Sequence, residues 1–239
     1  MLARGFYGSI LLLCGLATLG CQQFSGRPHG SEDNRPEDNK DFSRLYSQNC
    51  SGCHGADGQH GVAIALANPE YQAIVDEKTL RDVISNGEQG TLMPSFAKSA
   101  GGALTDEQVN ILVQGMRSHW YKAGLLNGID VPPYAASKQG DAAHGQQAFT
   151  TYCASCHTTG AQSDKAAKPS SVTDGSYLAL VSDQAMRALI IAGRPDLGHP
   201  DWRNAKSGHP MSDQEVTDLV AWIASQRQKT PGQTYPSQQ

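Results

Sequence analysis

The chain has no excess of basic side chains. Its 239 residues include 19 Lys and Arg against 23 Asp and Glu, for a formal net charge of −4 at pH 7. Binding to nucleic acid requires a basic footprint, so we exclude nucleic acid as a partner. The acidic balance permits docking on a protein that carries a basic patch.

Cysteine is scarce too, and its placement excludes two common uses. Of the six cysteines, Cys14 and Cys21 lie at the N-terminus, and the other four lie in two short strings, Cys50–His54 and Cys153–His157. None is left over for a disulfide framework or for the partner set of a zinc ribbon. The sequence also lacks a convincing β-strand run, because its apolar residues recur at helical spacing.

The two strings, C-S-G-C-H and C-A-S-C-H, share one pattern. C-x-x-C-H is the attachment pattern for c-type haem: the two thiols bond to the haem vinyl groups, and the adjacent imidazole binds the iron. One such string would also be compatible with chance, a redox pair or half a zinc site, but two in one exported chain are hard to explain otherwise. We therefore predict two covalently bound haems, attached through four thiols and bound on the proximal side by two imidazoles: Cys50, Cys53, Cys153, Cys156, His54 and His157.

The first twenty residues have the form of an export signal. Arg4 supplies a positive start, and Ile10–Leu19 is apolar but short for a helix that spans a bilayer. The stretch ends at Cys21 and resembles a bacterial lipoprotein signal, whose cysteine becomes the acylated first residue, although Thr18 stands where Leu is commoner. Ordinary cleavage nearby and an uncleaved anchor are the alternatives. All three export the protein, and we predict a periplasmic lipoprotein anchored to the membrane.

An internal repeat divides the rest of the chain. Residues 106 positions apart match, including Tyr71 with Tyr177 and Gly87 with Gly193. Polar and charged residues follow Cys21, as in a disordered tether. The predicted organisation is a signal peptide (1–20), a tether (21–40), two haem domains (41–125 and 141–227), a linker (126–140) and a flexible tail (228–239).

Within each copy the pattern is helical. One helix runs into each haem string, with Phe149 matching Tyr46 four residues before the first cysteine. Middle helices are predicted over 79–86 and 183–192, each ended by a glycine. The last helix of each copy opens with a capping box, at 105–108 and 212–215. The predicted fold class is all-α, with two small helical domains in tandem.

Each copy resembles a class I c-type cytochrome domain. That family has an N-terminal helix, C-x-x-C-H, a Gly-rich loop, a middle helix, a loop with the distal iron ligand and a C-terminal helix. The stretch Cys53–Gly58 has a common form of the family's start. The resemblance implies a two-haem electron-carrier cytochrome, each domain folded around its haem, and it names no partner.

The family's distal ligand is commonly a Met followed by Pro. Met93 has this context in the first copy. The repeat carries Met93 onto His199, also followed by Pro, so an imidazole replaces the thioether in the second copy. Met211 and His209 are alternatives there, as is an open site, although Met211 pairs with Val216 as a hydrophobic staple before the last helix.

Two ligands for each iron predict an exported electron carrier without catalytic residues. It would move electrons from a quinol-oxidising complex or periplasmic dehydrogenase to an oxidase or reductase. The alternatives are a haem enzyme with a displaceable ligand and an electron-transfer subunit of a membrane dehydrogenase or other oxidoreductase complex. A redox or gas sensor is a third class, but the sequence contains no output domain.

Overall fold

Helices make up the regular structure of the chain. The computed structural model describes residues 35–157 and 172–227. In those residues there is no β-strand, and two isolated bridges pair Ala97 with Leu104 and Arg194 with His199. The all-α prediction is confirmed. Over the same two ranges, no helix has the length and apolar character needed to cross a bilayer.

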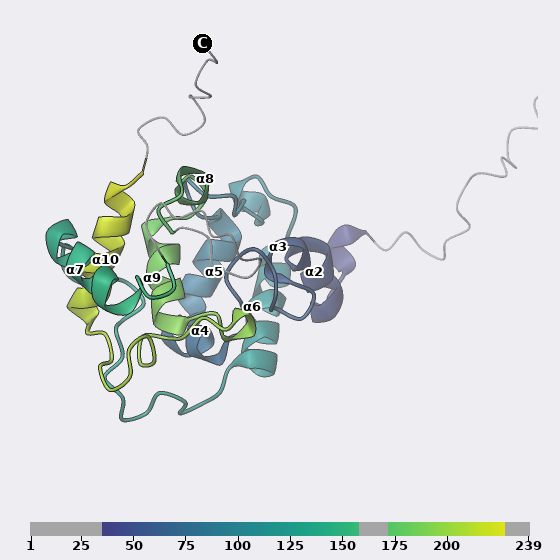
Figure 1. The fold of residues 1–239 in the computed structure, drawn as a ribbon. Helices are drawn as coiled ribbons and strands as arrows, with labels where there is room; N and C mark the ends of the chain where they lie inside the picture. The colour runs from purple at the N-terminus through teal and green to yellow at the C-terminus, as the bar shows by residue number, and fades with distance from the viewer. Residues whose placement is uncertain (1–34, 158–171, 228–239) are drawn as a thin grey trace, which may run out of the picture. The chain divides into compact units, whose positions relative to one another are not determined.

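The helices follow the repeat (Figure 1). The first half contains the 3-10 helix η1 (Pro36–Asp38), α2 (Phe42–Asn49), α3 (Ser51–His54), α4 (Pro69–Ile74), α5 (Glu77–Asn86), the 3-10 helix η2 (Lys98–Ala100) and α6 (Asp106–Trp120). The second half contains α7 (Ala142–Tyr152), α8 (Gly175–Leu178), α9 (Asp183–Ala192), the 3-10 helix η3 (Pro195–Leu197) and α10 (Asp213–Ser225).

Side chains at the N-caps fix where the helices begin. Asp76 accepts a hydrogen bond from the Thr79 amide (2.6 Å), so α5 begins at Glu77, two residues before the predicted start. The second middle helix, α9, has the predicted bounds. Both predicted capping boxes are present, formed by Thr105 with Gln108 and by Ser212 with Glu215.

The predicted glycine ends are present as well, and each lets a loop return against its helix. Gly87 and Gly193 have φ of 71° and 68°, values that residues other than glycine rarely adopt. A Cβ on Gly87 would lie 2.6 Å from the Met93 carbonyl oxygen, and one on Gly193 would lie 2.7 Å from the Pro200 carbonyl oxygen. The loops expected to carry the distal ligands therefore pack directly on the ends of α5 and α9.

The first and last helices of each copy cross at a glycine, but on opposite helices. Gly115 of α6 receives the ring of Phe42, whose Cδ2 lies 2.0 Å from the position of a Cβ. In the second copy the glycine is Gly145 of α7, where a Cβ would lie 2.7 Å from the Cβ of Trp222. Aligned on the haem strings and capping boxes, Phe42 corresponds to Gly145 and Gly115 to Trp222. The large and the small residue have exchanged helices.

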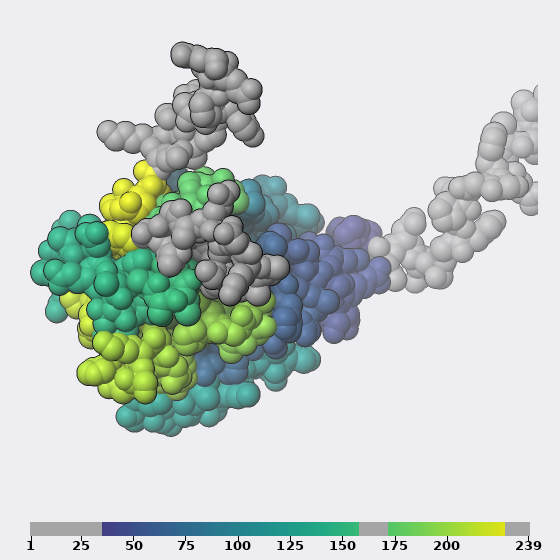
Figure 2. All heavy atoms as spheres, viewed as in Figure 1, coloured from purple at the N-terminus to yellow at the C-terminus, as the bar shows by residue number. Residues whose placement is uncertain are grey.

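The two copies pack against each other as well as being joined by the linker (Figure 2). Both belong to a compact unit that begins at Pro36. Ala188 and Ala192 of α9 belong to the apolar cluster of the first copy, and Ile74 of α4 packs on the core of the second. The Asn68 side chain donates to the Ala192 carbonyl (2.9 Å). Helices α4 and α9 thus form a seam between the copies.

Parts of the predicted tether and linker have defined partners. Gln108 of α6 donates to the Pro36 carbonyl (2.7 Å), which holds η1 against the first copy. In the linker, the Pro133 carbonyl accepts from Nε (3.0 Å) and Nη2 (2.8 Å) of Arg187, and Tyr134 packs on the first core. Backbone carbonyls on both segments thus attach them to the helices.

Candidate haem centres

Each haem string continues from a helix. The Cys50 amide donates to the Tyr46 carbonyl at the end of α2 (2.8 Å), and the Cys153 amide donates to the Phe149 carbonyl at the end of α7 (2.9 Å). Burial raises the pKa of Cys50 to about 12 and of Cys153 to about 11, and the second thiol of each string adds to the rise. A redox C-x-x-C pair depends on a lowered thiol pKa. The environment of both strings is therefore unlike that of a redox pair.

The imidazole of His54 has the hydrogen bonding of a metal ligand. The side chain is buried, and Nδ1 lies 2.8 Å from the Ile64 carbonyl oxygen. Because a carbonyl only accepts, Nδ1 carries the proton and Nε2 keeps its lone pair. Burial lowers the pKa of His54, against the effect of the bond to Ile64. The ring is thereby held neutral, as metal binding requires.

Met93 lies in the loop between α5 and η2, and its side chain is half-buried. The loop is fixed by one backbone bond and one side-chain bond, since the Glu88 amide donates to the Met93 carbonyl (3.0 Å) and the Met93 amide donates to Thr91 Oγ1 (3.1 Å). A half-buried thioether on a fixed loop is available to a bound group, unlike a methionine packed in the core.

In the second copy the structure brings two histidines together. The ring centroids of His157 and His199 are 5.9 Å apart, with 51° between the ring planes. Two imidazoles on opposite sides of one metal ion have centroids roughly 6 Å apart, given metal–nitrogen bonds of about 2.0 Å. The observed separation therefore fits a shared iron.

His199 has features that suit a ligand. Its Nδ1 is buried, and no residue in the described ranges forms a hydrogen bond with it. Burial lowers the pKa of His199, and the neighbouring His157 lowers it further, against the effect of the Pro200 backbone, so the neutral form of the ring is favoured. The loop is held by paired backbone bonds with Arg194, at 3.0 and 2.9 Å. The bond from the Arg194 amide repeats that from Glu88 to Met93, so His199 occupies the place of Met93.

The two alternative ligands have different surroundings. Met211 is 4% exposed and lies in the second core with Val216, as the staple requires. Its amide donates to the Trp202 carbonyl (3.0 Å). His209 is exposed, and its amide donates to the Lys206 carbonyl (3.1 Å). Of the three candidates, His199 is the one whose ring the structure pairs with that of His157.

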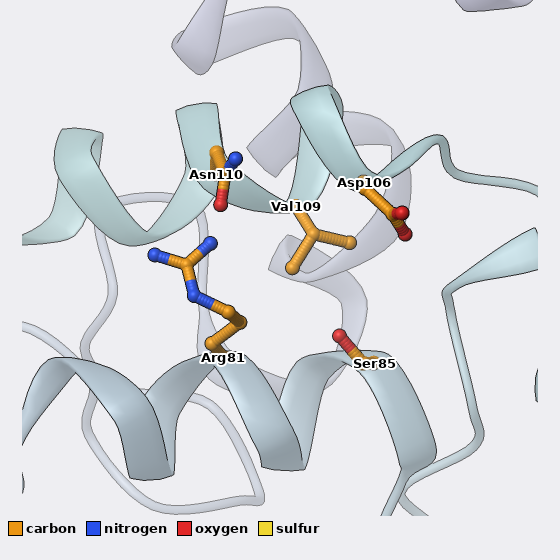
Figure 3. Close-up of a pocket in the computed structure, with 5 residues that line it drawn as sticks. All are labelled: Arg81, Ser85, Asp106, Val109 and Asn110. Atoms are coloured by element: carbon orange, nitrogen blue, oxygen red, sulfur yellow. The ribbon is translucent and has the colours of Figure 1, made fainter. Parts of the chain in front are cut away.

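Two arginines at equivalent positions of the repeat have different surroundings. Arg187 is buried and bonds Thr217, Asp213 and the linker carbonyl of Pro133. Its counterpart Arg81 lines a surface pocket between α5 and α6, where its guanidinium points toward α6 (Figure 3). The other lining residues are Ser85, Asp106, Val109 and Asn110. Arg187 of the second copy thus has a hydrogen-bond acceptor in the linker, and Arg81 of the first copy has none there among the described residues.

Sequence analysis did not identify Arg194 and Asp196. Both side chains are nearly buried, and they form an ion pair of 2.8 Å between Nη2 and Oδ2. Arg194 also contacts the carbonyls of Gly61 and Ala63 in the first copy. The repeat offered a signal, because it aligns Arg194 with Glu88 and so reverses the charge at that position.

Comparisons with known proteins agree with the repeat. Residues 37–114 match the family model for cytochrome c oxidase, cbb3-type, subunit III, and residues 142–227 match the model for cytochrome c. No curated protein sequence matches. A solved structure of a reducing HAO-like protein complex from Kuenenia stuttgartiensis is similar over 80% of this chain and 99% of the other, with 17% identity and a TM-score of 0.47.

The two family matches lie one after the other and together cover more than half of the chain. Each match contains the C-x-x-C-H string of its copy. Domains of this kind carry covalently bound haem and indicate electron transfer. With two of them in tandem, and so two c-type haems, the chain is a two-haem c-type cytochrome.

Proposed function

We propose that this cytochrome is an exported electron carrier in which the protein would supply two ligands to each iron. The observation that supports it best is the 5.9 Å separation of the His157 and His199 rings, which suits two ligands on one iron. An iron with two protein ligands has no open position for a substrate, so it serves electron transfer and not catalysis.

The proposed ligand sets follow the repeat. The first haem is attached through Cys50 and Cys53 and bound by His54 and Met93. The second is attached through Cys153 and Cys156 and bound by His157 and His199. The haem supplies a one-electron iron couple when bound, and methionine ligation raises its potential relative to a second imidazole. We therefore expect two redox waves, with the first domain at the higher potential.

The chain's own residues keep the ligands in place. The Ile64 carbonyl accepts a hydrogen bond from Nδ1 of His54, which leaves Nε2 free to bind the iron. The bridge between Arg194 and His199 fixes the backbone that would carry the second ligand of the second haem. Ligands held in this way change little between oxidation states, which keeps the reorganisation that accompanies electron transfer small.

Carbon monoxide tests the carrier against a haem enzyme. The reduced wild-type protein should bind it poorly at both haems, while His199→Ala should bind it at one. His209→Ala is the matched control, because that exposed histidine is not proposed as a ligand. Rapid binding by the wild type would reject the carrier in favour of an enzyme or a sensor.

Electron paramagnetic resonance combined with near-infrared spectroscopy of the oxidised protein tests the ligands. One methionine–iron charge-transfer band is expected, and Met93→Ala should remove it. His199→Met should add a second band and raise the lower redox wave. The ligand assignment is wrong if Met211→Leu abolishes a band of the second haem while His199→Ala leaves that haem low-spin.

A permanent subunit of a membrane oxidoreductase complex is the second candidate. The match of residues 37–114 to a subunit of an oxidase favours it. Mild detergent extraction and size-exclusion chromatography distinguish the two functions: a carrier elutes alone at the mass of one chain, and a subunit elutes with partner proteins at a fixed ratio.

Export and anchoring are also proposals. The signal peptide (1–20), the tether up to residue 34, Cys21 and the tail (228–239) lie outside the described residues. Removal of residues 1–20 takes away Arg4 and no acid, which makes the mature chain more acidic and favours partners with a basic patch around their own redox centre.

Membrane partition and an acyl mass on the wild type, both lost in Cys21→Ser, would support the lipid anchor. Soluble wild-type protein without an acyl mass would reject it.

A further inference from the structure

A buried ion pair lies at the seam between the two copies. Arg194 and Asp196 meet through two bonds, from Nε to Oδ1 (3.0 Å) and from Nη2 to Oδ2 (2.8 Å). Their side chains are 10% and 2% exposed. A bidentate pair of this kind is well ordered, because the planar guanidinium matches the carboxylate.

The pair binds a single loop of the first copy. Arg194 Nη1 donates to the Ala63 carbonyl (2.7 Å) and Nη2 to the Gly61 carbonyl (3.0 Å). The His60 amide donates to Asp196 (2.8 Å). Ile64, which follows Ala63 in the loop, supplies the carbonyl that orients His54. The ion pair therefore holds the loop that sets the proximal ligand of the first haem.

The same residue also holds the distal side of the second haem. The Arg194 amide donates to the His199 carbonyl (3.0 Å), and the His199 amide donates to the Arg194 carbonyl (2.9 Å). Arg194 thus reaches toward His54 with its side chain and toward His199 with its backbone.

The bond from His54 Nδ1 to the Ile64 carbonyl links this loop to the iron. A hydrogen bond to the outer nitrogen of a metal-bound imidazole tunes how strongly the ring donates to the metal. Because Arg194 bonds the carbonyl of the preceding residue, Ala63, loss of the guanidinium would shift the loop and alter that bond. The potential of the first haem would then change.

The first copy has the opposite charge at the equivalent position. Glu88 repeats the backbone bond to its distal loop, but its carboxylate accepts a hydrogen bond from Ser182, the N-cap residue of α9. Glu88 and Arg194 thus both form hydrogen bonds across the seam. Of the two, only Arg194 bonds a loop next to a proximal ligand, His54.

We propose that Arg194 is a positioning residue for both haem irons, through which the two redox centres are coupled. Its guanidinium fork fixes the loop 60–64 behind His54, and its backbone fixes His199. The proposal rests on His54 and His199 being the iron ligands proposed above. A change at Arg194, in the second domain, must then alter the haem of the first domain.

Two variants of the holoprotein remove the guanidinium fork without leaving an unpaired buried charge. Arg194→Lys keeps the positive charge but loses the planar fork, so it cannot bond both carbonyls and Asp196 together. The double variant Arg194→Leu with Asp196→Leu removes the pair without leaving one buried charge alone. Arg227→Lys is the matched control, because Arg227 also bonds two carbonyls and an aspartate, but within the second copy.

Hydrogen–deuterium exchange and redox titration are the measurements. We expect exchange of the amides in residues 58–66 to rise at least tenfold in both Arg194 variants and to stay unchanged in the control. At fixed ambient potential, the double variant should change the ratio of reduced to oxidised first haem at least threefold, about 28 mV for one electron. Arg194→Lys should change it less.

Two results would overturn the proposal. If exchange in residues 58–66 is unchanged, the guanidinium does not hold the loop. If exchange rises but the first haem titrates as in the wild type, Arg194 is a structural contact without influence on that iron. Wild-type resonance spectra test the ligand assignment separately, so failure of the proposed ligands and failure of the coupling give different results.

Discussion

Replacement of Gly145 by Ala tests the close crossing of α7 and α10. The new Cβ would lie 2.0 Å from the Asp218 carbonyl oxygen and 2.7 Å from the Cβ of Trp222. Non-bonded heavy atoms in ordinary contact are about 3.5 Å apart, so α10 must move by roughly 1.5 Å. The obstacle is helix backbone, which cannot turn aside as a side chain does.

Two opposing effects decide the magnitude. Alanine within a helix is favoured over glycine by about 1 kcal/mol, while overpacking a well-packed core costs about 1–3 kcal/mol and occasionally more. Because the contact is with backbone, we expect the upper part of that range. The net loss is then about 1–2 kcal/mol, which lowers the Tm of a domain of this size by roughly 5–15 °C.

Thermal unfolding of the holoprotein, followed by circular dichroism and by haem absorbance, measures the effect. Gly115→Ala is the control in the first copy, where the new Cβ meets the ring of Phe42. That side chain is half-buried at the first position of α2 and can shift, so the loss should be smaller. A Gly145→Ala protein as stable as the wild type, or less affected than Gly115→Ala, would refute the argument.

Three further predictions concern acid stability, haem content and helix capping. The hydrogen bond from Arg194 lowers the pKa of Asp196 to about 2, so the pair contributes about 2 kcal/mol of stability above pH 4 that is lost as the pH falls toward 2. The free energy of unfolding of Asp196→Asn, measured against pH, should not fall over this range as that of the wild type does. An equal fall in both proteins would contradict the stabilising role of the pair. Replacement of Cys153 and Cys156 by Ala should reduce the covalent haem from two to one per chain in denatured mass spectra, and a wild-type mass with fewer than two would end the two-haem interpretation. Ser212→Ala should cost about 1 kcal/mol in chemical denaturation through loss of the capping box, whereas no loss would mean that α10 starts elsewhere.

Features with a local cause could be predicted from the sequence. The capping boxes at Thr105 and Ser212 and the glycine ends of α5 and α9 depend on residues three or four positions apart, so composition and spacing are enough. The haem strings are local as well. The alignment of His199 with Met93 also matches the structure, because the repeat preserves the backbone bond that holds each loop.

Contacts across the seam could not be predicted. Arg187 and Arg194 bind backbone carbonyls of Pro133, Gly61 and Ala63, and a carbonyl leaves no mark in the sequence because every residue has one. Only the folded chain decides which carbonyl comes within reach. The short helix α4 was missed although its start has a local signal, with Asn68 as N-cap and Pro69 at the first helical position.

The exchange of large and small residues between the helix crossings bears on how duplicated domains avoid misassembly. Tandem copies in one chain are prone to swap equivalent elements while they fold. If α2 were to pair with α10, Phe42 would meet Trp222, and the two aromatic side chains would compete for one space. If α7 were to pair with α6, Gly145 would face Gly115 and leave a void. Each N-terminal helix therefore fits the C-terminal helix of its own copy and rejects that of the other, so that each haem string is delivered to the correct domain.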